Sequence, residues 1–161
     1  SYPGGVSSFR GVHYTMHHTG RGTKQKKVLL LITNGVDRHS KHTNYEELLR
    51  SVQQTEAVLY VVMLPGHPDE RNRWEKARQQ LLKLAQVTGG QAYFPISIDQ
   101  VRATCGEIAR DIRSQYILAY YSTNRARDSR FRTVRVEVKS PQGSGRLIVR
   151  TRAGYNKGLT E

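Results

Sequence analysis

The stretches that decide the fold of this chain are VLLLIT (Val28–Thr33) and AVLYVVML (Ala57–Leu64). Each is apolar at consecutive positions, which is the pattern of a strand buried on both faces of a parallel sheet. Asn34 and Gly35 follow the first stretch, and a Pro-Gly pair follows the second, so both end in turns. The two stretches therefore predict parallel strands in a sheet that helices cover on both sides.

Helical spacing marks the segments between and after these strands. Apolar residues recur every three or four positions over 45–52, 74–85 and 101–112. A short helix is expected over Phe9–His18 and a short strand over Gln91–Phe94. This alternation predicts an α/β fold, a partial doubly wound (Rossmann-like) parallel sheet with right-handed crossovers and helices on both faces.

The helix boundaries carry local signals. Thr43 with Glu46, and Ser97 with Gln100, have the spacing of capping boxes. The single cysteine, Cys105, excludes an internal disulfide and falls on the apolar side of the last helical segment. We expect it to be buried as a small hydrophobic residue.

The pattern changes after the helices. Tyr116–Tyr121 is apolar enough for a further strand, and Thr133–Val138 alternates between apolar and polar residues. After the turn-rich Ser140–Gly145, the segment 146–152 alternates again, which predicts a C-terminal antiparallel β-hairpin. The expected organisation is an N-terminal segment that is flexible or forms a short helix (1–26), an α/β unit (27–123) and a basic hairpin extension (124–161).

Charge suggests one class of partner. The chain holds 26 Lys and Arg against 13 Asp and Glu, a net charge of +13, and such an excess attracts polyanions. We predict a polyanion- or partner-binding surface on the hairpin and its connector, formed by Arg125, Arg127, Arg130, Arg135, Arg146, Arg150 and Arg152. A solvated arginine face on an antiparallel sheet remains the alternative, since no recognised nucleic-acid motif accompanies it.

Catalytic signatures do not assemble. His13 and His17 have the spacing of two metal ligands on one helical face, but no third ligand is evident and solvated histidines fit as well. Adjacent carboxylates occur where helices begin, at 46–47 and 69–70, and there they favour the helix dipole. We expect a protein that binds and is not an enzyme. No apolar run is long enough to span a membrane, and no secretory signal is present in this chain.

Several motifs, in order, resemble von Willebrand factor A domains. TNGVD (Thr33–Asp37) is similar to the strand end of these domains, and LKLAQVTGGQAYF (Leu82–Phe94) to a later helix–strand unit. IRSQYILAYYSTN (Ile112–Asn124), Phe131–Val138 and the closing RAGY (Arg152–Tyr155) resemble the tail of a subgroup found in acidobacterial secreted proteins. The resemblance covers roughly residues 27–155, matches the C-terminal half of the domain, and implies an adhesion or protein-interaction role outside the cytoplasm.

In that family a divalent cation, usually Mg²⁺, is held by an Asp-x-Ser-x-Ser loop, a threonine and an aspartate. Here the first loop is missing, Val6 or Ser7 stands near the threonine position, and Asn34 replaces the aspartate, with Asp37 close by. Hard cations need several converging oxygens. The resemblance therefore implies a degenerate site at Ser7, Asn34 and Asp37, and we expect no metal and no other cofactor.

The resemblance also implies a missing neighbour for the first strand. Residues 1–26 are too few to supply the three strands that precede it in the ordinary domain. We expect an exposed sheet edge near Val28–Ile32, with Leu29 and Leu31 lacking their covering helices. An open apolar edge is a template for another chain, so this edge is expected to bind a protein partner or a second copy.

Overall fold

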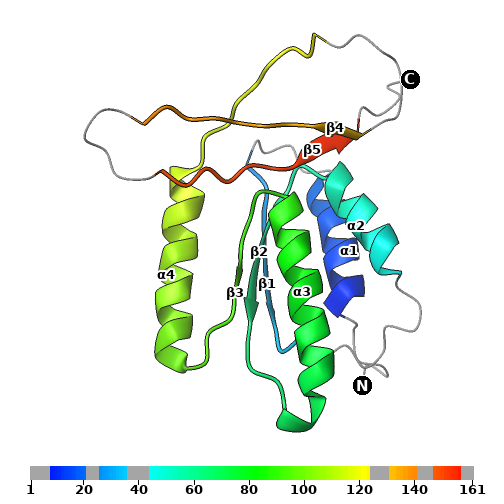
Figure 1. Ribbon diagram of the computed structural model, residues 1–161, viewed down its shortest axis with the longest axis vertical. Helices are drawn as coiled ribbons and strands as arrows, with labels where there is room; N and C mark the ends of the chain where they lie inside the picture. Colours follow the sequence, from blue (N-terminus) through cyan, green and yellow to red (C-terminus); the bar gives the residue numbers. More distant parts are fainter. Residues whose placement is uncertain (1–7, 21–25, 36–43, 124–130, 141–146, 157–161) are drawn as a thin grey trace.

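The computed structural model describes residues 8–20, 26–35, 44–123, 131–140 and 147–156 (Figure 1). Its centre is a three-stranded parallel sheet in the order β1-β2-β3. The strands are β1 (Val28–Thr33), β2 (Val58–Met63) and β3 (Ala92–Tyr93). The α/β class and the parallel sheet expected from the two apolar stretches are confirmed. Strand β2 is central, and β1 lies at one edge.

Three helices cover one face of this sheet: α1 (Ser8–Gly20), α2 (Tyr45–Gln54) and α3 (Arg71–Val87). Their apolar sides meet the odd-numbered residues of β1 and β2 in the larger core cluster. Its fully buried members include Val12, Met16, Leu48, Val52, Leu59, Val61, Met63, Leu81 and Leu84. Most of the hydrophobic stabilisation of the fold comes from this layer, because buried apolar area is concentrated there.

Helix α4 (Ile98–Ser114) lies on the opposite face, apart from the other helices in Figure 1. Ile108 packs there against Tyr60 and Val62 of β2. Helices thus flank both faces, as the sequence predicted, but unequally. Within the described residues no helix is long and apolar enough to cross a membrane.

Helix starts follow the sequence signals in part. Ser97 caps α4, and its hydroxyl accepts a hydrogen bond from the backbone N–H of Gln100. The returning side chain of Gln100 accepts from the N–H of Ile96, one residue before the cap. For α2 the N-cap is Asn44, whose side chain accepts from the N–H of Glu46. The predicted cap at Thr43 is therefore wrong, since Asn44 satisfies this helix end one residue later.

A compact junction joins α3 to β3. The buried Thr88 hydroxyl donates to the carbonyl of Ala85 and accepts from the N–H of Leu59. Gly89 follows with φ +82, which suits glycine at the end of a helix. A Cβ on Gly90 would lie 1.9 Å from the carbonyl oxygen of Leu59. The Gly-Gly pair thus ends the helix as predicted and lets the loop approach β2 closely.

The C-terminal part forms a separate two-stranded antiparallel sheet, β4 (Phe131–Thr133) with β5 (Gly154–Asn156). One further hydrogen bond, from Val134 to Ala153, continues the pairing inward. In Figure 1 the two arms of this hairpin extend across the end of the parallel sheet. A hairpin is therefore present, with its strands at the open end and shorter than predicted.

Two expectations fail in this region. Residues 116–123 form no strand, so the strand predicted over Tyr116–Tyr121 is wrong: the segment leaves the parallel sheet for the hairpin and has no ladder partner among the described residues. Cys105 is exposed, not buried. The buried stripe of α4 runs through Thr104 and Ile108, and α4 makes only a narrow contact with the sheet that leaves Cys105 outside.

Candidate functional site

The second face of β1 lacks the cover that its neighbour has. Leu30 and Ile32 are 43% and 56% exposed, whereas their register partners on β2, Tyr60 and Val62, are 2% and 0% exposed. Helix α4 covers β2 on this face, and of β1 only Val28 packs against the same cluster. The prediction that β1 is buried on both faces is therefore wrong for Leu30 and Ile32.

The uncovered residues also differ from those expected. Leu29 and Leu31 were expected to lack helices, yet both pack against the larger core cluster. Helix α1 contacts β1 on that face, and its Met16 is fully buried. The N-terminal segment thus supplies the helix that covers Leu29 and Leu31. The uncovered side chains of β1 are those of Leu30 and Ile32, on the opposite face.

The outer edge of β1 has no paired strand among the described residues. At the two ends of the ladder, Val58 N–H donates to the carbonyl of Lys27 and Leu64 N–H to that of Thr33. Because backbone groups alternate along a strand, the odd-numbered residues of β1 face β2. The N–H and C=O groups of Leu30 and Ile32 therefore point to the open edge. We call this edge, with the side chains of Leu30 and Ile32, the β1 surface.

A second exposed apolar stretch begins beside the β1 surface. Gln115, directly after α4, accepts a hydrogen bond on its carbonyl from the Lys26 ammonium at 3.0 Å and donates from its side chain to the Tyr60 hydroxyl at 3.1 Å. The following apolar side chains are largely in solvent, namely Tyr116, Ile117, Leu118, Tyr120 and Tyr121. Exposed apolar clusters of this kind mark interaction sites in soluble proteins.

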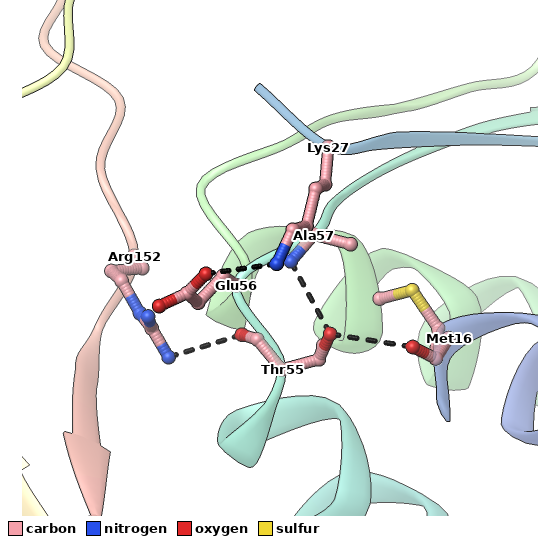
Figure 2. A network of polar contacts seen from close by, with 6 residues as sticks. All are labelled: Met16, Lys27, Thr55, Glu56, Ala57 and Arg152. Atoms are coloured by element: carbon pink, nitrogen blue, oxygen red, sulfur yellow. Dashed lines mark hydrogen bonds and ion pairs between the residues drawn. The ribbon is translucent and has the colours of Figure 1, made fainter. Parts of the chain in front are cut away.

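Of the predicted arginine surface, Arg152 has a structural position. Its guanidinium donates to the backbone carbonyls of Gln53 and Thr55, at 3.0 and 3.1 Å, and to that of Gly154 at 3.0 Å. Figure 2 shows it beside Thr55, whose hydroxyl in turn donates to the carbonyl of Met16. Burial lowers the pKa of Arg152, and the nearby Glu56 opposes that shift. The Arg152 side chain thus joins the hairpin to the end of α2, and the Thr55 hydroxyl joins that end to α1.

The other described arginines of that surface are ion-paired. Arg150 pairs with Asp111 of α4, and the two side chains are partly buried. Arg135 pairs with Glu137 at 2.8 Å, with both side chains largely in solvent. Exposed pairs of this kind contribute little to stability, so Arg135 is available to a ligand. Four predicted members lie outside the described residues: Arg125, Arg127, Arg130 and Arg146.

Between the hairpin and the sheet a shallow pocket of about 310 Å³ opens next to Arg150. It is lined by Gln91, Tyr93, Glu107, Arg110, Asp111 and Arg150. The two carboxylates and two guanidinium groups balance in charge. Such a lining fits a structural polar contact between the hairpin and α4 better than a binding site that selects an anion or a cation.

A polar cluster on the hairpin was not predicted from the sequence. The Tyr120 and Tyr155 hydroxyls are hydrogen-bonded to each other, and Ser122 bonds both Tyr155 and the Arg132 guanidinium. The hydrogen bonds from Tyr120, Ser122 and Arg132 lower the pKa of Tyr155. The cluster ties residues 120–122 to the antiparallel sheet. Its members are far apart in sequence, so local patterns could not reveal it.

The predicted metal position is represented by one described residue. Asn34 is exposed directly after β1, whereas Ser7 and Asp37 lie outside the described residues. Within the described ranges, no three His, Cys, Asp or Glu side chains gather as a cation would require. Of the two histidines at metal-ligand spacing, His13 is exposed on α1, and the side chain of His17 lies outside the described part of the structure. The neighbouring His18 is exposed, and its ring lies against Tyr14.

Comparisons with known proteins give no relative. The sequence matches no protein-family model, and searches of curated proteins and of solved structures find no similar protein.

Proposed function

We propose that this chain is a protein-interaction or adhesion module of the von Willebrand factor A type, with a degenerate metal site, and that it works within a larger assembly by binding. The observation that carries the proposal is the β1 surface. Leu30 and Ile32 offer apolar side chains and, at the same positions, backbone edge groups that no described strand pairs. Strand addition uses this combination: backbone bonds give affinity, and alternate side chains give specificity.

The finer family assignment rests on the sequence motifs. The helix–strand unit at 82–94 and the strand end at 33–37 have the order expected of such a domain. The parallel order β1-β2-β3 is compatible with the C-terminal half of a doubly wound sheet, in which further strands would precede β1. The same resemblance supports a location outside the cytoplasm.

A displayed library of extended peptides, about nine residues long, tests the proposal. We expect selected peptides to bind the chain, and Ile32→Lys to weaken binding at least tenfold because a charged edge opposes strand addition. Ile148→Lys is the matched control, since Ile148 is 77% exposed and lies on the hairpin. Equal binding by the parent and Ile32→Lys, with circular dichroism unchanged, would remove the β1 surface from the proposal.

A polyanion-binding role is the second candidate. The exposed Arg135 and the net charge of +13 favour it. Neutralising several phosphates or sulfates makes affinity fall steeply as salt rises, whereas a packed strand interface changes little. Titration of the chain with heparin and with a selected peptide, each at low and high salt, separates the two roles.

A further inference from the structure

We propose that the β1 surface binds a second copy of this chain, through antiparallel pairing of the two β1 strands about a two-fold axis. This inference rests on the proposed function, for which it names the partner. Three features of the edge carry it: the backbone groups that point outward belong to even-numbered residues, the exposed side chains belong to the same residues, and the lysines lie at one end of the strand.

Backbone geometry restricts the pairing. A two-fold axis perpendicular to the sheet keeps each face of one copy beside the same face of the other. Residues opposite each other in an antiparallel ladder point to the same face, so an even-numbered residue must oppose an even-numbered one. The outward N–H and C=O groups also belong to even-numbered residues. Leu30 can therefore exchange both backbone hydrogen bonds with Ile32 of the second copy, and Ile32 with Leu30.

Side-chain burial favours this register. With Leu30 opposite Ile32, the axis passes between the two Leu31 residues, and the most exposed residues of β1 meet each other. The Leu30 and Ile32 side chains of both copies then form one apolar cluster on the face that α4 leaves uncovered. The two sheets would join into one sheet with β1 strands at its centre.

The charges of the edge favour antiparallel pairing over parallel pairing. The exposed Lys26 precedes β1, followed by Lys27, which pairs with Glu56 at 3.1 Å, while the opposite end continues into the uncharged Asn34 and Gly35. Antiparallel pairing keeps the two Lys26 ammonium groups at opposite ends of the new ladder, whereas parallel pairing would place them side by side. Each copy still carries +13, so screening by salt should strengthen self-association. Polyanion binding has the opposite salt response.

Disulfide trapping tests the register. In a Cys105→Ser background, which removes the exposed native thiol, Leu31→Cys lies opposite itself across the axis, within disulfide reach. Oxidation should give a dimer that reduction reverses. Leu30→Cys lies opposite Ile32, so its two thiols are too far apart and it should stay monomeric. Failure of Leu31→Cys to cross-link more than Leu30→Cys would overturn the register and the proposal with it.

Light scattering of the unmodified chain is the second measurement, since Leu31→Cys alters a residue packed against the core. We expect a dimer at micromolar concentration, a dissociation constant at least tenfold higher for Ile32→Lys, and tighter association at higher salt. A species of 18.3 kDa at every salt concentration would overturn self-pairing. If selected peptides still bind that monomer through Ile32, the interaction module stands and only its partner was misassigned.

Discussion

The guanidinium group of Arg152 donates a hydrogen bond to the backbone carbonyl of Thr55, 3.1 Å away and 97 positions earlier in the chain. The same nitrogen also donates to the carbonyl of Gln53. These carbonyls lie where α2 ends and have no partner within the helix. A cation is also favourable at a helix C-terminus. One side chain thus fastens the C-terminal hairpin to the α/β layer.

Replacing this side chain should destabilise the fold. We expect Arg152→Ala to lower the free energy of unfolding by about 2–3 kcal/mol, because several carbonyls lose a charged donor. Urea unfolding followed by circular dichroism measures the loss. Arg135→Ala is the control and should cost at most about 0.5 kcal/mol, as exposed substitutions usually do. Equal stability of the two variants would mean that the Arg152 contacts are not worth more than a surface pair.

The buried Thr88 hydroxyl links the end of α3 to the central strand. It accepts from Leu59 N–H at 2.9 Å and donates to Ala85 C=O at 2.7 Å. Thr88→Val keeps the shape but leaves the Leu59 donor unsatisfied, so we expect a loss of about 1–3 kcal/mol. Thermal unfolding compares it with the exposed Thr133→Val, which should unfold near the parent temperature. A loss no larger in Thr88→Val would show that water replaces the hydroxyl.

Much of the fold could be predicted because its signals are local. The consecutive apolar residues of β2 give a central strand, and the spacing of Ala77, Leu81 and Leu84 gives the buried side of α3. Burial of β1 could not be predicted in the same way. Its sequence is as apolar as that of β2, but the burial of its side chains depends on which helices pack over this edge strand. Leu30 and Ile32 are exposed because α4 packs on β2 instead.

The candidate site was predicted in outline and not in detail. The resemblance implied an open edge near Val28–Ile32, because residues 1–26 are too few for the strands that precede it in the resembled domain, yet the uncovered side chains were expected to be Leu29 and Leu31. The role of α1 decided this, and its contact with β1 is tertiary. Likewise Arg150 and Arg152 share a strand pattern with other arginines, while their partners, Asp111 and Thr55, are distant in sequence.

Ionisation of Tyr60 makes the free energy of unfolding depend on pH in the alkaline range. Burial raises its pKa above the ordinary value, Asp111 adds to the shift, and the hydrogen bond from Gln115 partly opposes it. The folded state therefore holds this proton more tightly than the unfolded state. The stability that Tyr60 contributes is fully present below its pKa in the unfolded state, about 10. It is lost as the pH rises through the pKa of Tyr60 in the folded state.

Tyr60→Phe should remove this dependence. At neutral pH we expect a loss of about 0.5–1.5 kcal/mol from the missing hydrogen bond. Above pH about 10 the gap to the parent should narrow, because only the parent has a phenol at position 60 to ionise. Urea unfolding at a series of pH values measures both, with the exposed Tyr14→Phe as control. A gap that stays constant with pH would contradict the assignment to Tyr60.

Metal binding is the next expectation to measure. Asn34 offers a neutral amide where the resembled family has a carboxylate, and no Asp-x-Ser-x-Ser loop occurs in the sequence. Titration calorimetry with Mg²⁺ and with Mn²⁺ should show no stoichiometric site tighter than about 100 μM, since such affinity needs several converging oxygens. Asn34→Asp alone should not create one. A saturable site in the parent that Asn34→Asp tightens would mean that the metal position is functional.

Arg135 and Arg146 test the polyanion role. Arg135 is exposed, and Arg146 belongs to the same predicted surface. The double variant Arg135→Ser, Arg146→Ser should elute from heparin at lower salt than the parent, because it makes fewer ionic contacts. Arg102→Ser, Arg113→Ser removes the same charge from exposed positions on α4. If the hairpin arms form a binding surface, the first variant loses more retention than the second. If both lose the same amount, retention reports the net charge of the chain and the hairpin arginines are a solvated face.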